Sequence, residues 1–288
     1  MTSIAAVDPA LARRMWSLYE PIHVVTYFTP QAKAAFEDAG LRGFWRGYFG
    51  GRAAPLGPVG AAPVVASFFS FAPSMVERAL PDIWTRATPE RALQARVDGA
   101  VAALVSILGE IDASTLTEIA DLLDAAATDL DCAGRVLAAA NLQFVGDGEP
   151  WVRIWNATTL LREHRGDGHV AAQVAAGVTG CEALVWRSSY DLVRDHLQPN
   201  RGWTDDEWDA ARASLRERGW LDEDGRATAS GEAHHQEIED ATDRAALAPW
   251  RALGPERTER LAELLTPLAR VLAAPMVDFN PIGLPQPG

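Results

Sequence analysis

The segment 203–232 constrains the fold most, because it combines a strong helix start with a tight turn. Thr204 is followed three residues later by Glu207, which is the spacing of a capping box at the beginning of a helix. Beyond that helix, Asp224-Gly225 lies in the middle of a short segment whose ends are apolar. This dipeptide is typical of hairpin tips, so we expect a helix, a two-stranded hairpin and a second helix in succession.

Shorter helices are expected before this segment, over residues 169–176 and 180–190. The complete order of short helices, a longer helix, a hairpin and a following helix is that of a winged helix-turn-helix. The residues LRERGWLDEDGRATASGEAHHQEIE, 215–239, resemble the end of such domains in the multiple-antibiotic-resistance-regulator class. That resemblance implies a β wing and a next helix that often joins a dimer interface, so a homodimer is a further expectation.

A boundary between two halves is expected at Asp147–Pro150, where turn residues gather between periodic segments. Ala39-Gly40-Leu41, followed by Gly43 and Trp45, is similar to Ala176-Gly177-Val178, followed by Gly180 and Trp186, which suggests duplication. We therefore predict a mainly α fold with two winged-helix-like halves, short β wings and additional helices. The predicted halves are 1–146 and 147–288, the second ending in a C-terminal helix and a Pro-rich tail.

The charge distribution disfavours nucleic acid as a partner. The net charge is −13, and residues 111–288 carry 30 acidic and 16 basic side chains. Such a field opposes binding to phosphates. The chain has two cysteines outside any C-x-x-C motif and no apolar run of membrane-spanning length. We therefore expect a cytoplasmic protein without a membrane partner.

The densest polar cluster is the octapeptide from Arg162 to His169. His164, Asp167 and His169 are candidate catalytic residues for proton transfer, since imidazole titrates near neutrality. The spacing is not that of a zinc-binding H-E-x-x-H motif, so no metal is predicted and any cofactor is unknown. The alternative is a solvated helix end, at which the glycines 166 and 168 break the helix and Asp167 caps the next one. Candidate ligand-binding residues in the cluster are Arg162, Glu163 and Arg165.

Aromatic residues near the N-terminus form a second candidate site. A small-molecule pocket needs aromatic rings and a few convergent polar groups. The alternative is a core with tyrosine hydroxyls at its margin. The candidate ligand-binding residues here are His23, Tyr27, Trp45, Tyr48 and Arg52.

The segment Gly180–Tyr190 occupies the place of a recognition helix in the predicted order. Arg187 is its only basic residue, whereas a helix that reads the major groove offers several Arg, Lys, Asn or Gln side chains. Packing or ligand contact is the better interpretation of this segment.

The chain as a whole resembles a family of actinobacterial helix-turn-helix proteins of about 290 residues, for which no activity is settled. The resemblance implies a fold and provides no catalytic residues. The segments that carry it are Glu20–His23, Tyr27-Phe28, Leu41–Trp45, Tyr48-Phe49, Gly51–Gly57, Leu160–Val170, Arg201–Trp203 and Asn280–Pro285.

Three functions stay open at this level. The first is binding of a bulky small molecule in a pocket between the halves, and the second is an enzyme using the His/Asp cluster there. The third is a ligand-responsive transcription regulator. The first two require the two candidate sites to meet, so we predict Arg52 or His23 within roughly 10 Å of Glu163, His164 or Asp167.

Overall fold

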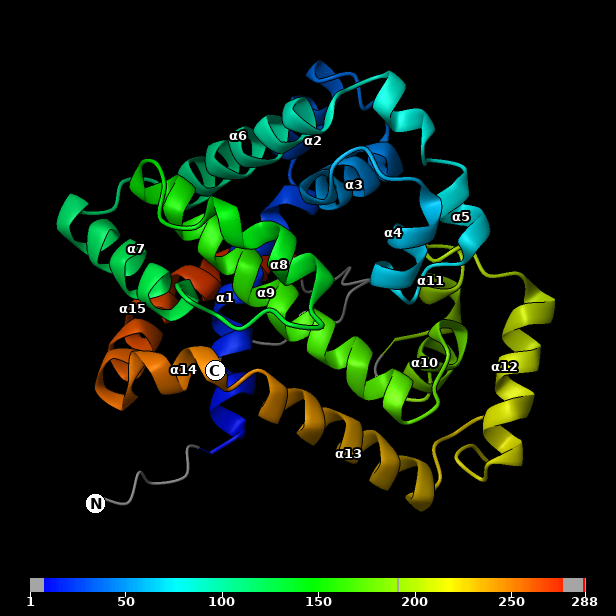
Figure 1. The fold of residues 1–288 in the computed structure, drawn as a ribbon. Coiled ribbons are helices and arrows are strands. Elements are labelled where there is room, and N and C mark those ends of the chain that lie inside the picture. Colours follow the sequence, from blue (N-terminus) through cyan, green and yellow to red (C-terminus); the bar gives the residue numbers. More distant parts are fainter. Residues whose placement is uncertain (1–7, 191, 277–286, 288) are drawn as a thin grey trace.

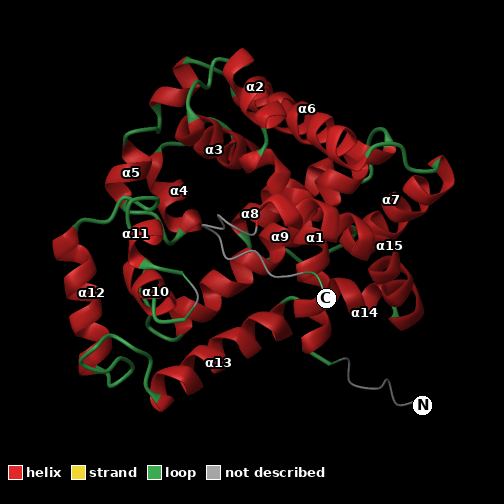
Figure 2. Cartoon of the chain, turned by 180° about the vertical axis from the view of Figure 1, so that it is seen from behind, coloured by secondary structure: helices red, strands yellow, loops and turns green. Residues whose placement is uncertain are grey.

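The computed structural model describes residues 8–190, 192–276 and 287, and helices make up most of them (Figures 1 and 2). The tail segment Asn280–Pro285, which carries part of the family resemblance, lies outside the described residues.

No β-strand forms in the described part of the chain, so the predicted winged-helix halves with β wings are wrong. Where the C-terminal wing was expected, a single antiparallel bridge joins Leu221 and Ala227. The Asp-Gly turn is present, with Asp222 N–H donating to the Arg226 carbonyl over 2.9 Å. Only one pair of residues, Leu221 and Ala227, forms a bridge across this turn. Trp220 comes just after the preceding helix, and Thr228 already caps the next one. The hairpin is therefore too short to become a ladder.

The long helix α9, Pro150–Ala175, runs through the middle of the molecule in both views (Figures 1 and 2). It packs against α1, α6, α7, α8 and α13, and the largest apolar core lies around it and α1. This core includes residues from both sides of the expected boundary at residues 147–150. The last residue of that boundary, Pro150, is the first residue of α9. The other helices around this core are α1 (Ala10–Phe28), α6 (Pro89–Leu108), α7 (Ala113–Ala127), α8 (Val136–Asn141), α14 (Ala248–Leu253) and α15 (Pro255–Ala273).

The expected helix break at residues 166–168 does not occur, and α9 continues through both glycines. An added Cβ at Gly168 would lie 2.6 Å from Nη1 of Arg135 and 3.3 Å from Cβ of Ala245. The missing side chain thus allows the Arg135 guanidinium to reach the carbonyls of His164 and Ala245. Close tertiary packing outweighs the low helix propensity of glycine at this point.

A second core holds the short helices of the N-terminal region together against α6. The helix α2, Pro30–Asp38, lies close along α6, because Gly99 has no Cβ and the Cα of Ala32 occupies that space, 2.7 Å from where a Cβ would be. This contact fixes α2 relative to α1 and α3. The remaining elements of the region are α3 (Phe44–Ala53), η1 (Ala54–Leu56), α4 (Ala61–Phe68), α5 (Pro73–Glu77) and η2 (Asp82–Thr85).

A third core joins the helices that follow α9. The capping box expected from the sequence is confirmed, since Thr204 pairs with Glu207 at the start of α12. Thr179 and Glu182 form a second capping box at the start of α10. These caps fix where α10 and α12 begin. The elements of this region are α10 (Gly180–Arg187), α11 (Arg194–Leu197), α12 (Asp205–Glu217) and α13 (Ala229–Ala245); η3 (Leu142–Phe144) and η4 (Ala274–Met276) lie elsewhere in the chain.

Candidate functional site

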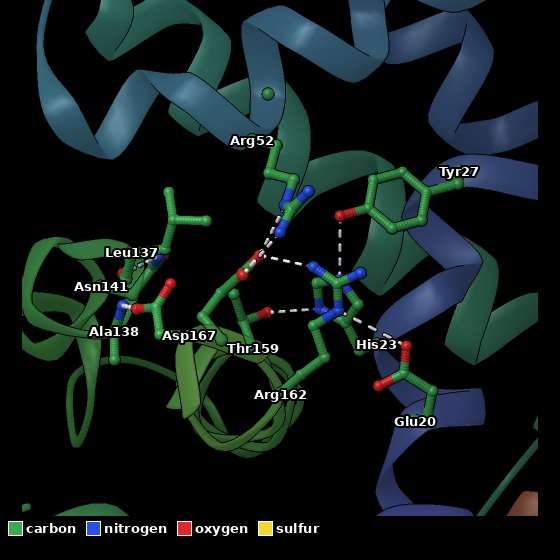
Figure 3. Close-up of polar contacts among 12 residues, drawn as sticks. Glu20, His23, Tyr27, Arg52, Leu137, Ala138, Asn141, Thr159, Arg162 and Asp167 are labelled. Atoms are coloured by element: carbon green, nitrogen blue, oxygen red, sulfur yellow. Dashed lines mark hydrogen bonds and ion pairs between the residues drawn. The ribbon is translucent and has the colours of Figure 1, made fainter. Parts of the chain in front are cut away.

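Polar side chains from three helices meet between α1, α3 and α9, as Figure 3 shows. Each of them lies on the side of its helix that faces the other two helices, so the group is mostly withdrawn from solvent. We call this group the buried polar network. Its members are Glu20, His23 and Tyr27 from α1, Tyr48 and Arg52 from α3, and Thr159, Arg162 and Glu163 from α9.

The ion pair between Arg52 and Glu163 is the centre of the network. Arg52 donates from Nε to Oε1 of Glu163 over 2.9 Å and from Nη2 to Oε2 over 3.0 Å, which is the two-pronged geometry that suits a guanidinium and a carboxylate. The Glu163 side chain is 2% exposed and that of Arg52 is 11% exposed. Burial alone would raise the pKa of Glu163, but the guanidinium groups of Arg162 and Arg52 lower it well below its ordinary value. Glu163 is therefore ionised at neutral pH.

This ion pair confirms the prediction that the two candidate sites meet. Arg52 and Glu163 are 111 positions apart in the sequence, yet their side chains are in direct contact. No acidic residue lies within ten positions of Arg52 in the sequence, so its partner has to come from elsewhere in the fold.

A second arginine and a second carboxylate make the charges of the network balance. Arg162 donates to Oε1 of Glu163 over 2.7 Å and approaches Glu20 at 3.5 Å. Burial raises the pKa of Glu20, while Arg162 and the indole N–H of Trp16 act in the opposite direction. Two arginines thus face two glutamates, which is the condition under which buried charges are tolerated.

His23 is held as a neutral imidazole by a directional chain of hydrogen bonds. Thr159 donates its only hydroxyl proton to the Trp155 carbonyl over 2.8 Å, so it accepts from Nδ1 of His23 over 3.0 Å. The other ring nitrogen, Nε2, then accepts from the Tyr27 hydroxyl over 3.0 Å. Burial, followed by the charge of Arg162, lowers the pKa of His23 well below its ordinary value. This ring is locked in one tautomer and stays uncharged at neutral pH.

The rings of Tyr27 and Tyr48 form a wall between the network and a cavity of about 270 Å³. Their ring centroids are 5.0 Å apart, and Tyr48 accepts a hydrogen bond from Arg52 on the network side over 3.2 Å. The cavity lies between α1, α2 and α3, within residues 26–48, and not between two halves as the sequence suggested. Its aromatic lining is Tyr27, Phe28, Phe36, Phe44 and Tyr48, and its polar lining is Thr26, Thr29, Lys33 and Glu37.

Of the five N-terminal residues predicted to bind a ligand, Tyr27 and Tyr48 line this cavity. His23 and Arg52 lie in the network behind the tyrosine wall. Trp45 contacts the rings of Phe49 and Phe71, at centroid distances of 6.0 Å and 5.9 Å, and belongs to the edge of the second core.

The predicted ligand-binding residue Arg165 points away from this cavity. It donates to Asp243 of α13 over 2.7 Å, and its guanidinium lies 4.8 Å from the centroid of the Trp16 ring. Asp243 also accepts from Arg13, so α1, α9 and α13 are joined by a buried carboxylate that is 4% exposed.

The three predicted catalytic residues lie on one helix but face different neighbours. Asp167 accepts from the backbone N–H of Ala138 at the start of α8 over 2.9 Å, and in Figure 3 its carboxylate points to α8, away from Arg162. His164 is buried beside Arg135 and the backbone of Asp131. Burial raises the pKa of Asp167 to about 6 and lowers that of His164 to about 4.

His169 faces the opposite side, towards α13. Its Nδ1 lies 2.9 Å from Oγ1 of Thr242, and its Nε2 lies 3.0 Å from the side-chain amide of Gln173. Burial lowers the pKa of this imidazole to about 4, although Glu239 opposes the shift. His169 therefore does not share a reaction space with Asp167. In the described residues, no three His, Cys, Asp or Glu side chains are arranged to hold a metal ion.

Several residues of the site were not singled out from the sequence. Phe28 directly follows the candidate residue Tyr27, and Phe44 directly precedes the candidate residue Trp45. A helical projection of residues 27–48 would have placed both on the cavity side. Glu20 could have been recognised from the sequence, because it is the only carboxylate in α1. Lys33 is the only lysine in the sequence, and no local pattern marks it as a residue of a cavity.

The sequence profile of the Helix-turn-helix family matches residues 12–277. The chain belongs to this family. The match covers all three cores and nearly every described helix of this helix-turn-helix protein. No curated protein and no solved structure matches the chain. No described helix has the length and apolar character needed to cross a membrane.

The exposed face of α12 gives this helix-turn-helix protein an unusual surface. The helix directly precedes the tight turn at 222–226, and it follows α10, the helix predicted to hold the recognition position, by two helices. Its first turn carries Asp205, Asp206 and Glu207, all exposed. Negative side chains at this end would face phosphate groups of the same sign.

Proposed function

We propose that this protein binds a compact aromatic small molecule in the cavity between α1, α2 and α3. The observation that carries the proposal is the cavity itself: about 270 Å³, lined by five aromatic rings and by few polar groups. Small-molecule sites are mostly apolar clefts with a small number of placed polar groups, and this volume is close to the lower end of their range. The size suits a ligand of about two fused rings rather than the bulky molecule that the sequence suggested.

The cavity is accessible from solvent at the side of Phe44 and Lys33. Phe44 is 45% exposed, and the Lys33 side chain is 68% exposed. Large exposed apolar side chains at the mouth of an aromatic cleft are typical of binding sites. The opposite wall is stiff, because Tyr27 and Tyr48 are held from behind by His23 and Arg52. A preformed wall reduces the entropy that binding must overcome.

The single lysine provides a direct test. Lys33 lines the cavity, and the sequence contains no other lysine, so an amine-reactive reagent reports on this position. We expect that 2-naphthol slows acetylation of Lys33 by acetic anhydride, measured by peptide mass spectrometry, with the α-amino group of the chain as internal reference. Equilibrium dialysis with naphthalene and 2-naphthol then gives the affinities.

A matched pair of variants separates this cavity from unspecific apolar binding. Phe44→Ala removes a wall of the cavity at an exposed position and should weaken naphthalene binding about fivefold, since an aromatic contact contributes on the order of 1 kcal/mol. Val174→Ala, at a position 60% exposed on the far end of α9, should leave it unchanged. Equal effects of the two variants, or unprotected Lys33, would refute the proposal.

Regulation of transcription is the second candidate, because the chain belongs to a helix-turn-helix family. In this case ligand binding near α1–α3 would change the orientation of α12 towards DNA. The acidic first turn of α12 argues against direct phosphate contacts. Absence of salt-sensitive DNA binding at about 50 mM salt, where phosphate contacts are strongest, would eliminate this candidate.

A further inference from the structure

One helical threonine in the cavity wall differs from its counterparts in the fold. Within a helix, a threonine hydroxyl usually donates to the carbonyl four residues earlier. Thr117, Thr128, Thr159, Thr242 and Thr266 all do this, as does Thr29 at the cap of α2, with donor–acceptor distances of 2.7–2.8 Å. Thr26 does not. Its hydroxyl is buried and has no hydrogen-bond partner within the described part of the chain.

Thr26 is 3% exposed and is one of the residues that line the cavity, next to Tyr27. A buried polar group without a partner costs free energy, and proteins retain such groups mainly where a ligand or a water supplies the partner. The neighbouring Thr29 also lines the cavity, but its hydroxyl is already used, accepting from Ala32 N–H and donating to the Val25 carbonyl. Thr26 is thus the threonine of this wall whose hydroxyl has no partner within the described residues.

We propose that Thr26 determines specificity, and that its hydroxyl forms a hydrogen bond with a hydroxyl or carbonyl substituent at the buried end of an aromatic ligand. This inference rests on the proposed function of the cavity. It adds a chemical class: the ligand is a phenol or an aromatic ketone rather than a plain hydrocarbon.

The polar substituent is uncharged. Among the described residues lining the cavity, the charged ones are Lys33 and Glu37, which lie at the exposed rim, 4.0 Å apart, and balance each other. No arginine is among the described residues that line the cavity, and the guanidinium of Arg52 lies behind Tyr48 and is already engaged with Glu163. An anionic group beside Thr26 would therefore be buried without a compensating charge, which is costly.

The test compares naphthalene with 2-naphthol, which differ by one hydroxyl group. Equilibrium dialysis measures both affinities for the wild-type protein and for Thr26→Val, a variant of nearly the same shape without the hydroxyl. The ratio of the 2-naphthol affinity to the naphthalene affinity should fall about 2- to 12-fold in Thr26→Val, the range of a single neutral hydrogen bond. Taking this ratio cancels any general effect of the substitution on the cavity.

Thr26→Ser is the matched control, because it retains the hydroxyl and should keep the wild-type ratio. Thr26→Val without ligand should be at least as stable to heat as the wild type, since it removes an unsatisfied polar group. If both compounds bind and the ratio is the same in Thr26→Val as in the wild type, the role of Thr26 is wrong and the proposed function stands. If neither compound binds the wild type, both the function and the role of Thr26 are overturned.

Discussion

Replacing Glu163 by glutamine should destabilise the protein strongly, because it removes one of two carboxylates that neutralise two buried arginines. Glu163 is 2% exposed and accepts from both Arg52 and Arg162. In Glu163→Gln, Glu20 alone would face the two guanidinium groups. Breaking one partner out of a buried ion pair costs about 3–5 kcal/mol, since the remaining charge is left without compensation in a poorly solvated place.

The free energy of unfolding is measured by urea denaturation at pH 7, followed by tryptophan fluorescence and circular dichroism. For 288 residues the unfolding entropy is about 0.6 kcal/mol/K, so the same loss corresponds to a decrease of Tm by about 5–8 °C. Glu259→Gln is the control. Glu259 pairs with Arg14 at 2.6 Å, but both side chains are about half exposed, and an exposed pair contributes less than about 1 kcal/mol.

A double variant checks the reasoning about charge. Arg52→Gln combined with Glu163→Gln leaves Arg162 facing Glu20, one charge of each sign. We expect it to lose less stability than the two single variants added together, by about 1–3 kcal/mol. Strict additivity, or a cost of Glu163→Gln no larger than that of Glu259→Gln, would show that the network does not act through charge balance.

The remaining predictions concern α9 and nucleic acid. The folded-state pKa of His164, about 4, lies below its ordinary value of 6.5, so its contribution to stability is present above pH 6.5 and is lost as the pH falls to 4. The free energy of unfolding of His164→Gln, measured by urea titrations, should therefore decrease less between pH 6.5 and pH 4 than that of the wild type. Parallel curves of unfolding free energy against pH for the two proteins would contradict this. Gly166→Ala, whose Cβ would meet Oε2 of Glu163 at an ordinary contact distance of 3.8 Å, should stabilise the protein by up to about 1 kcal/mol, whereas Gly168→Ala should destabilise it by displacing Arg135. A thermal melt of each that gave shifts of the same sign would contradict this packing. A 50 mM to 200 mM salt series with random-sequence duplex DNA should give no binding at any concentration, and salt-dependent retention would contradict the electrostatic interpretation of α12.

The sequence predicted local structure where a local signal determines it. The capping box at Thr204 sets a helix start through side chains three residues apart and is present, and α10 begins at Gly180 as expected. The meeting of Arg52 with Glu163 could also be predicted, because an arginine beside apolar sequence requires a distant partner.

The failures have a common physical cause, which is tertiary packing. The glycines of α9 look like a helix break to any local rule, but Arg135 and Ala245 fill the space beside Gly168. The expected wing contained the correct turn, yet the flanking segments belong to helix ends, which leaves one bridge. Likewise, an unsatisfied hydroxyl at Thr26 depends on the surroundings of a helix end and has no signature in sequence.

The position of Glu163 in the chain also sets an order on assembly. Arg52 is synthesised more than a hundred residues before its carboxylate partner, and Glu20 reaches its arginine only when α9 is present. A nascent chain that ends before residue 150 can form the helices of the N-terminal region, but it cannot bury Arg52 beside a compensating charge. Collapse of that region around its aromatic residues therefore costs free energy until α9 has been synthesised. We expect the N-terminal helices and α9 to form their shared interior in one cooperative step rather than as independent units.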